Sequence, residues 1–200
     1  NHEFDYSHEN TIKLRELANY PFITTNILDE KNQPFGNMPY QIFSLDSLKI
    51  GIMGLTLTEL PQKVKRENIT GLTILPYKEA IDKYIEEVDK QSDLIILLTH
   101  NGLGADSLLA TVLDNRIDLI IGGHSHTVIS EPFQVNGIYI ASAGSYLNYL
   151  GAINLEVQND RIFAYKSKLI PLIAPENLPP TPLNQFVKTI ADSLEKETGK

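Results

Sequence analysis

Apolar residues follow two different spacings along the chain, and segments of the two kinds alternate. Residues 76–90 carry apolar side chains at helical spacing. These are Ile81, Tyr84, Ile85 and Val88. Residues 93–99 and 117–121 are continuous apolar runs, typical of strands buried on both faces, and residues 105–113 between them predict a second helix. The order of helix, buried strand, helix and buried strand predicts parallel α/β packing with a right-handed crossover.

Weaker patterns predict the rest of the fold. Residues 11–19 indicate a short helix that ends before Pro21, and residues 56–73 are irregular and polar. Short apolar or alternating runs predict further strands at 22–25, 40–45, 47–55, 138–141, 151–157 and 161–169. The last three alternate most clearly and are expected to be antiparallel. The whole chain is therefore predicted to be a mixed α/β protein.

The C-terminal part begins with a run of prolines. Residues 171–182 are predicted to be a linker. Thr181 and Pro182 then suit the N-cap and first position of a last helix through residue 200. An apolar stripe runs along it: Leu183, Phe186, Val187, Ile190, Ala191 and Leu194. Such a stripe needs a surface to pack on, so we expect the helix to lead into a further domain.

Composition narrows the class of protein. Hydrophobic residues make up 42% of the 200 residues and charged residues 21%, as in folded soluble domains. The net charge of −8 argues against a nucleic-acid polymer as partner, but allows a small phosphorylated substrate held by a metal. Cysteine is absent, which excludes disulfides and thiolate metal sites. No apolar run approaches the roughly 20 residues of a membrane span.

The placement of the histidines is the main chemical signal. His100 ends one buried strand, and His124 and His126 follow the other in Gly-Gly-His-Ser-His. If the two strands are parallel neighbours, their carboxyl ends share the sheet edge where α/β proteins bind ligands. Converging imidazoles suit Zn²⁺, Mn²⁺ or iron. In an extended chain His124 and His126 would point to opposite sides, which favours two adjacent metals over one.

A structural interpretation stays open for each site. A single histidine at a strand end is usually a hydrogen-bonded structural residue, and a lone His-x-His is often no metal site. The amino-terminal segment Asn1-His2-Glu3-Phe4-Asp5 is a third candidate. Asn1 offers a carbonyl oxygen to a cation. His2 has the chemistry of a general acid or charge stabiliser, and Asp5 that of the carboxylate orienting it.

These stretches together resemble a known family. Asn-His-Glu-Phe-Asp, Leu-Leu-Thr-His-Asn-Gly and Gly-Gly-His-Ser-His-Thr are similar to the second half of a calcineurin-like metallophosphoesterase. Thr25-Asn26-Ile27, Ala143-Gly144-Ser145-Tyr146 and Tyr149-Leu150-Gly151 narrow the resemblance to the bacterial 5'-nucleotidase and UDP-sugar hydrolase family. It covers about residues 1–170. Four of the five histidines lie in its motifs, and His8 is predicted to be a surface residue.

The resemblance implies an αββα sandwich and a centre of two divalent ions such as Zn²⁺ or Mn²⁺. Asn1, His100 and His124 would ligate one metal and His126 the other. His2, oriented by Asp5, would stabilise the transition state or protonate the leaving oxygen. The substrate would be a nucleotide phosphomonoester, attacked by a water that both metals activate.

The chain departs from the family pattern at both ends. The family's Asp-x-His and Gly-Asp motifs precede Asn-His-Glu, and its nucleoside-binding domain follows the linker. We therefore expect residues 1–170 to be the later part of a phosphoesterase domain, 171–182 a linker, and 183–200 a helix before an absent domain. The missing parts would be partners supplied by the same protein or by another chain. By itself the chain would hold a partial metal centre and turn over little substrate.

Two alternatives stay open. The chain could belong to a 2',3'-cyclic-nucleotide phosphodiesterase of the same family, or to an interaction domain that keeps the fold without catalysis. A metal titration tests the second alternative, because an interaction domain need not bind Mn²⁺ or Zn²⁺. By family resemblance the protein would be exported, although no signal peptide is visible.

Overall fold

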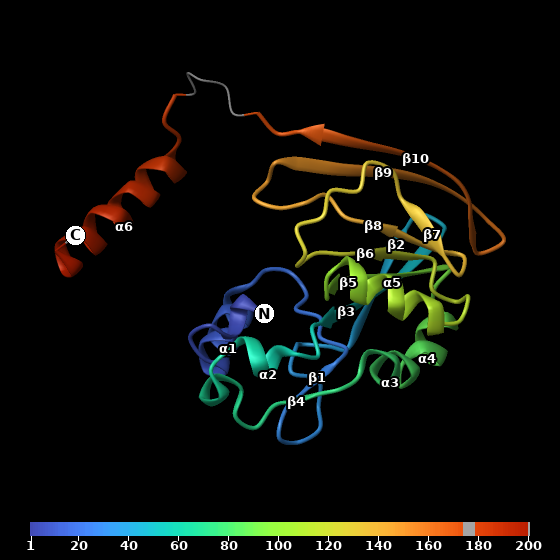
Figure 1. Ribbon diagram of the computed structural model, residues 1–200, viewed down its shortest axis with the longest axis horizontal. Helices are drawn as coiled ribbons and strands as arrows, with labels where there is room; N and C mark the ends of the chain where they lie inside the picture. The colour runs from blue at the N-terminus through green and yellow to red at the C-terminus, as the bar shows by residue number, and fades with distance from the viewer. Residues whose placement is uncertain (174–178, 200) are drawn as a thin grey trace.

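The computed structural model describes residues 1–173 and 179–199 (Figure 1). The helices are η1 (His2–Phe4), α1 (His8–Leu17), α2 (Leu60–Lys63), η2 (Arg66–Ile69), α3 (Tyr77–Asp82), α4 (Ile85–Asp89), α5 (Leu103–Val112) and α6 (Pro182–Thr198). The strands are β1 (Ile27–Leu28), β2 (Tyr40–Leu45), β3 (Leu48–Thr56), β4 (Thr73–Ile74), β5 (Leu94–His100), β6 (Leu119–Ile121), β7 (Phe133–Val135), β8 (Ile138–Ala141), β9 (Tyr149–Gln158) and β10 (Arg161–Pro171).

A six-stranded mixed sheet organises the body, in the order β2-β3-β5-β6-β8-β7. The four inner strands β3, β5, β6 and β8 are parallel, and the edge strands β2 and β7 are antiparallel to their neighbours. Helices α3, α4 and α5 lie on one side of this sheet and the β9–β10 hairpin on the other (Figure 1). The predicted mixed α/β class is confirmed.

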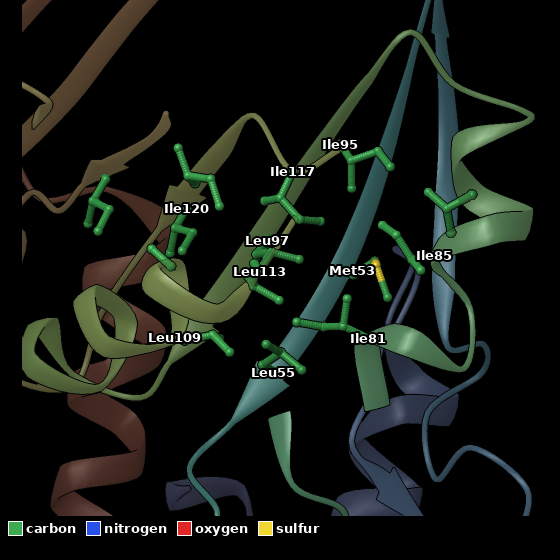
Figure 2. Close-up of a cluster of buried hydrophobic side chains, with 14 residues drawn as sticks. Met53, Leu55, Ile81, Ile85, Ile95, Leu97, Leu109, Leu113, Ile117 and Ile120 are labelled. Carbon is green, nitrogen blue, oxygen red and sulfur yellow. The ribbon is translucent and has the colours of Figure 1, made fainter. Parts of the chain in front are cut away.

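The main core fills the space between the sheet and these helices. Met53, Leu97 and Ile120 from the strands meet Ile81, Ile85 and other helix residues, all almost fully buried (Figure 2). The helical spacing and the continuous strand runs therefore predicted the correct contact face. A second cluster, Phe4, Ile27, Phe35, Leu60 and Ile69, joins the amino-terminal turn to the irregular segment after β3.

Several predicted elements differ in the structure. The helix expected over residues 76–90 is broken into α3 and α4, because the Tyr84 amide bonds to the carbonyl of Ile81, three residues back, and tightens the turn. Residues 22–25 form only an isolated bridge, between Ile23 and Met38. The helix expected over 11–19 is α1, which starts earlier because the Ser7 side chain accepts a hydrogen bond from the Asn10 amide.

The strand directions also needed a correction. β9 and β10 are antiparallel as predicted. β8 is antiparallel to β7, also as predicted, but it is parallel to its other neighbour, β6. The reason is that β7, which the sequence pattern did not predict, forms a hairpin with β8 at the sheet edge and fixes its direction. Residues 56–73 contain α2, η2 and β4 rather than irregular chain alone.

Helix α6 begins as predicted, with Thr181 and Asn184 in a reciprocal capping box and Pro182 in the first turn. It has no buried residue and stands apart from the body (Figure 1). Residues 174–178 of the predicted linker lie outside the described residues, so the linker and the domain boundaries stay predictions. Over the described chain, no helix combines the length and apolarity needed to cross a membrane.

Candidate active site

The two histidine-bearing strands are parallel neighbours, as predicted. Leu98 of β5 pairs with Ile121 of β6, so both strands end at the same edge of the sheet. His100 ends β5, and its ring lies edge-on to that of His124 with 5.1 Å between ring centroids. The two strands thus bring His100 and His124 to a shared edge, as predicted.

The loop after β6 is not extended, which corrects one assumption. His124 and His126 both have left-handed backbone, with φ of 73° and 56°. The two rings nevertheless diverge: His124 faces His100, while His126 lies edge-on to Tyr146 with 5.2 Å between centroids. Left-handed non-glycine residues are uncommon and concentrate at functional sites.

Small residues and local hydrogen bonds shape this loop. A Cβ at Gly123 would lie 3.2 Å from His100 Nδ1, so glycine lets the loop backbone pass close to that ring. The Leu103 amide donates to Ser125 Oγ at 3.1 Å, which ties the loop to the start of α5. The close approach of Gly123 to the His100 ring and the Leu103–Ser125 hydrogen bond therefore help to set the spacing of His100 and His124.

The amino-terminal turn supplies the third group of residues. Residues His2–Phe4 form one 3₁₀ turn, closed by hydrogen bonds from the Phe4 and Asp5 amides to the Asn1 and His2 carbonyls, both 3.1 Å. His2 Nδ1 lies 2.8 Å from Asp5 Oδ2, the pairing that the sequence predicted. The His2 side chain is 79% exposed and is therefore open to a ligand.

A cleft of about 440 Å³ brings the turn and β5 together. Asn1, His2 and Glu3 line it along with His100, and Phe22, Leu98 and Ile121 contribute apolar walls. Burial lowers the pKa of His100, and the neighbouring His124 lowers it further. A neutral imidazole is the form that binds a metal.

The residues present fit part of a metal centre. The Asn1 side-chain oxygen is buried and has no hydrogen-bond partner in the part of the chain that the structure describes, which is what a cation ligand would show. Across residues 1–173 and 179–199, no three His, Cys, Asp or Glu side chains are grouped closely enough to hold an ion. The ligand roles of Asn1, His100, His124 and His126, and the roles of His2 and Asp5, stay predictions.

Sequence reasoning missed a buried carboxylate beneath the site. Asp106 accepts hydrogen bonds from Thr99 Oγ1 at 2.9 Å and Asn101 Nδ2 at 3.1 Å, the two neighbours of His100. Burial raises the pKa of Asp106 to about 6, although both hydrogen bonds oppose the rise. The available signal was an acidic residue in the first turn of the mostly apolar helix that follows the His-Asn-Gly segment.

Asn68 was also missed, and His8 was described wrongly. Asn68 donates to the carbonyls of Phe4 and Asp5 from more than 60 residues away, and nothing in the local pattern marks it. His8 was expected at the surface, but its side chain is only 21% exposed, because it lies at the start of α1 against a small cleft.

Known proteins match both the sequence and the fold. Residues 1–128 match the family described as calcineurin-like phosphoesterase. Over 154 residues the chain is 33% identical to the uncharacterized metallophosphoesterase YunD of Bacillus subtilis strain 168, covering 76% of this chain and 32% of that protein. Over 202 residues it is 31% identical to the 5'-nucleotidase of Vibrio cholerae, covering 86% and 36% respectively.

Solved structures agree on the fold. The sulfate thiohydrolase SoxB of Thermus thermophilus superposes with a TM-score of 0.83 at 21% identity, over 98% of this chain and 35% of that one. The calcineurin-like phosphoesterase YfkN of Bacillus subtilis gives 0.78 at 23% identity, over 98% and 69%. The chain spans about a third of the length of the two curated relatives. It belongs to the calcineurin-like metallophosphoesterases.

Proposed function

We propose that the protein hydrolyses nucleotide phosphomonoesters, as a 5'-nucleotidase-like phosphoesterase. Membership of a family of phosphoric-ester hydrolases supports the reaction class. The observation that carries the proposal further is the His2–Asp5 pair, 2.8 Å apart, at a cleft that Asn1 and His100 also line. It supplies an oriented imidazole beside candidate metal ligands.

Each residue would have a distinct task. Two divalent cations, when bound, would activate water and neutralise charge on the phosphoryl group. Asn1, His100 and His124 would hold one cation through neutral donors, and His126 would serve the other. Asp5 would fix the His2 ring through Nδ1, so that Nε2 is free to hold a proton against the leaving oxygen.

The cation site would draw on chain beyond these 200 residues. The chain spans about a third of its curated relatives, and the described residues contain no group of three His, Cys, Asp or Glu side chains that could hold an ion. We therefore propose that the full-length gene product carries the activity and that this chain alone turns over little. Export stays a prediction from the family resemblance.

A second activity is supported by two relatives that share one name. Over 194 residues the chain is 26% identical to the 2',3'-cyclic-nucleotide 2'-phosphodiesterase/3'-nucleotidase of Salmonella typhimurium. A cyclic diester would use the same residues, with the ring oxygen as leaving group. Assaying AMP beside 2',3'-cyclic AMP separates the two activities.

The test is a kinetic comparison in the full-length gene product with Mn²⁺ supplied. We expect His2→Ala to lower kcat on AMP and on p-nitrophenyl phosphate by about 10²–10⁴-fold with little change in KM, because His2 would act in the transition state. Lys78→Ala is the control, since Lys78 pairs with Asp82 on the exposed side of α3. Equal small effects from both variants would remove His2 from the mechanism, and absence of any turnover would favour a non-catalytic domain.

A further inference from the structure

The turn that carries Asn1, His2 and Asp5 is held from a distant part of the chain. Asn68, in η2, is 5% exposed, and its side-chain amide donates to the Phe4 carbonyl at 2.8 Å and to the Asp5 carbonyl at 2.9 Å. A short helix leaves its last carbonyls without partners inside the helix. Asn68 therefore caps the carboxyl end of the 3₁₀ turn from outside.

Apolar packing fixes the same side of the turn. Phe4 is 4% exposed, and its ring contacts that of Phe35 with 5.6 Å between centroids. Ile69, the neighbour of Asn68, belongs to the same buried cluster. The hydroxyl of Thr11 donates to the Glu3 carbonyl. These contacts lock the buried side of the turn and leave His2 exposed at the cleft.

We propose that Asn68 is a positioning residue for the active site. Its two hydrogen bonds fix the position and orientation of the 3₁₀ turn η1. They thereby fix the positions of Asn1 and the His2–Asp5 pair relative to His100. The mechanistic part of this inference rests on the proposed function. The structural part, that Asn68 orders the turn, does not.

The chemistry of the two donors explains why the residue is asparagine. Both N–H groups of one planar amide are used on two adjacent carbonyls. Aspartate has the same shape but would set a carboxylate oxygen against carbonyl oxygens, while alanine would leave two buried carbonyls unpaired. Serine supplies one donor. The expected order of turn stability is therefore Asn, then Ser, then Asp.

Asn136 provides a matched control. Its side-chain amide also donates to two carbonyls, those of Ala110 at 3.2 Å and Leu113 at 2.9 Å. It lies before β8, at the opposite edge of the sheet from His100, because β8 is parallel to β5 and β6. Asn136 also has φ of 53°, so alanine there adds backbone strain and costs at least as much stability.

The structural experiment measures amide hydrogen exchange by NMR in the 200-residue chain. In Asn68→Asp we expect the Phe4 and Asp5 amides to exchange at least about 10-fold faster at a pH where the body stays folded, while Asn136→Ala leaves them unchanged. Asn68→Ser should give an intermediate exchange rate at both amides, and it replaces Asn68→Asp in the test if the aspartate variant does not fold. Unchanged exchange at both amides in Asn68→Ser and Asn68→Asp would overturn the proposal.

The kinetic experiment uses the full-length gene product. We expect Asn68→Asp to lower kcat at least about 10-fold with KM changed less than about 3-fold, and Asn68→Ser to restore part of kcat. A loss of kcat in Asn136→Ala as large as that in Asn68→Asp would overturn the positioning role, since it would reflect lost stability alone. If the wild-type protein shows no phosphatase turnover, the proposed function fails, and the exchange experiment still decides whether Asn68 orders the turn.

Discussion

Gly122 lies where the end of β6 passes over the Asp106 carboxylate. A Cβ at this position would come within 2.5 Å of Asp106 Oδ2. Asp106 has little room to retreat, because it is 1% exposed and holds Thr99 and Asn101 by hydrogen bonds. Glycine is therefore required here by close approach, and the contact links the histidine loop to the residues that flank His100.

We expect Gly122→Ala to lower the free energy of unfolding by about 1–3 kcal/mol, the usual effect of forcing an atom into a packed interior. The measurement is urea unfolding. Gly104→Ala is the control, because a Cβ at Gly104 in α5 meets nothing within 4 Å, and it should leave stability unchanged or slightly raised. A Gly122→Ala protein as stable as the wild type would contradict the tight contact.

The contacts of single residues were predictable from sequence where the residues belonged to a short local motif. The His2–Asp5 pair and the neighbouring rings of His100 and His124 followed from short spacings and one strand adjacency. Asn68 and Asp106 did not, because their partners are set by tertiary packing and no spacing rule connects them. The support around a site is thus less visible in sequence than the site itself.

Continuous apolar runs were the most reliable signal among the elements. β5 and β6 are inner parallel strands, as their composition predicted. The antiparallel prediction for β8 holds for its pairing with β7 and fails for its pairing with β6, because alternation indicates which faces are buried and does not indicate strand direction. The 76–90 helix kept its predicted apolar face even though the chain breaks at Tyr84.

The start of β6 carries a pH-sensitive contact. Asp118 is 6% exposed, and its Oδ2 accepts the Ile95 amide at 2.8 Å, which ties β6 to β5. Burial raises the pKa of Asp118 from 3.8 to about 6, although the Ile95 bond and Arg161 oppose the rise. The folded protein therefore binds more protons than the unfolded chain between about pH 4 and pH 6, and stability from this group falls as the pH rises through that window.

We expect Asp118→Asn to gain stability relative to the wild type, by up to about 3 kcal/mol, between pH 4 and pH 7, since each pKa unit corresponds to 1.36 kcal/mol. The measurement is urea unfolding of both proteins at several pH values. Asparagine still offers an oxygen to the Ile95 amide, so the strand contact is kept. A difference that stays constant with pH would show that Asp118 is ionised without cost.

Over the whole molecule, the proposed donors in the described chain would make only a partial cation site. As ligands, Asn1, His100 and His124 would be neutral donors and would leave a divalent charge poorly compensated, so we expect weak binding of at most one Mn²⁺ or Zn²⁺ by calorimetry. His100→Ala should abolish it. Acetylation of the amino terminus separates this site from chelation by the terminal amine with His2. Tight binding of two equivalents would refute the partial site.

The packing of α6 in the whole protein was the feature least predictable from sequence. The cap at Thr181 and the first turn of α6 follow local rules and were predicted correctly. What covers the exposed stripe of Leu183, Phe186 and Ile190 depends on surfaces far away in the sequence, and local patterns carry no information about them. The matches to known proteins indicate that the chain corresponds to about a third of its curated relatives, which the periodicity of apolar residues could not indicate.

The left-handed backbone at His124 and His126 means that the residue best for folding stability differs from the residue proposed to bind a metal. A side chain in this conformation costs about 1–2 kcal/mol relative to glycine. Exchanging either histidine for glycine would therefore relax the loop while deleting an imidazole. A screen that rewarded only resistance to heat would drift toward glycine at both positions and enrich proteins that lack the two proposed metal ligands. Engineering this scaffold for robustness would have to hold both positions fixed and seek its gains elsewhere.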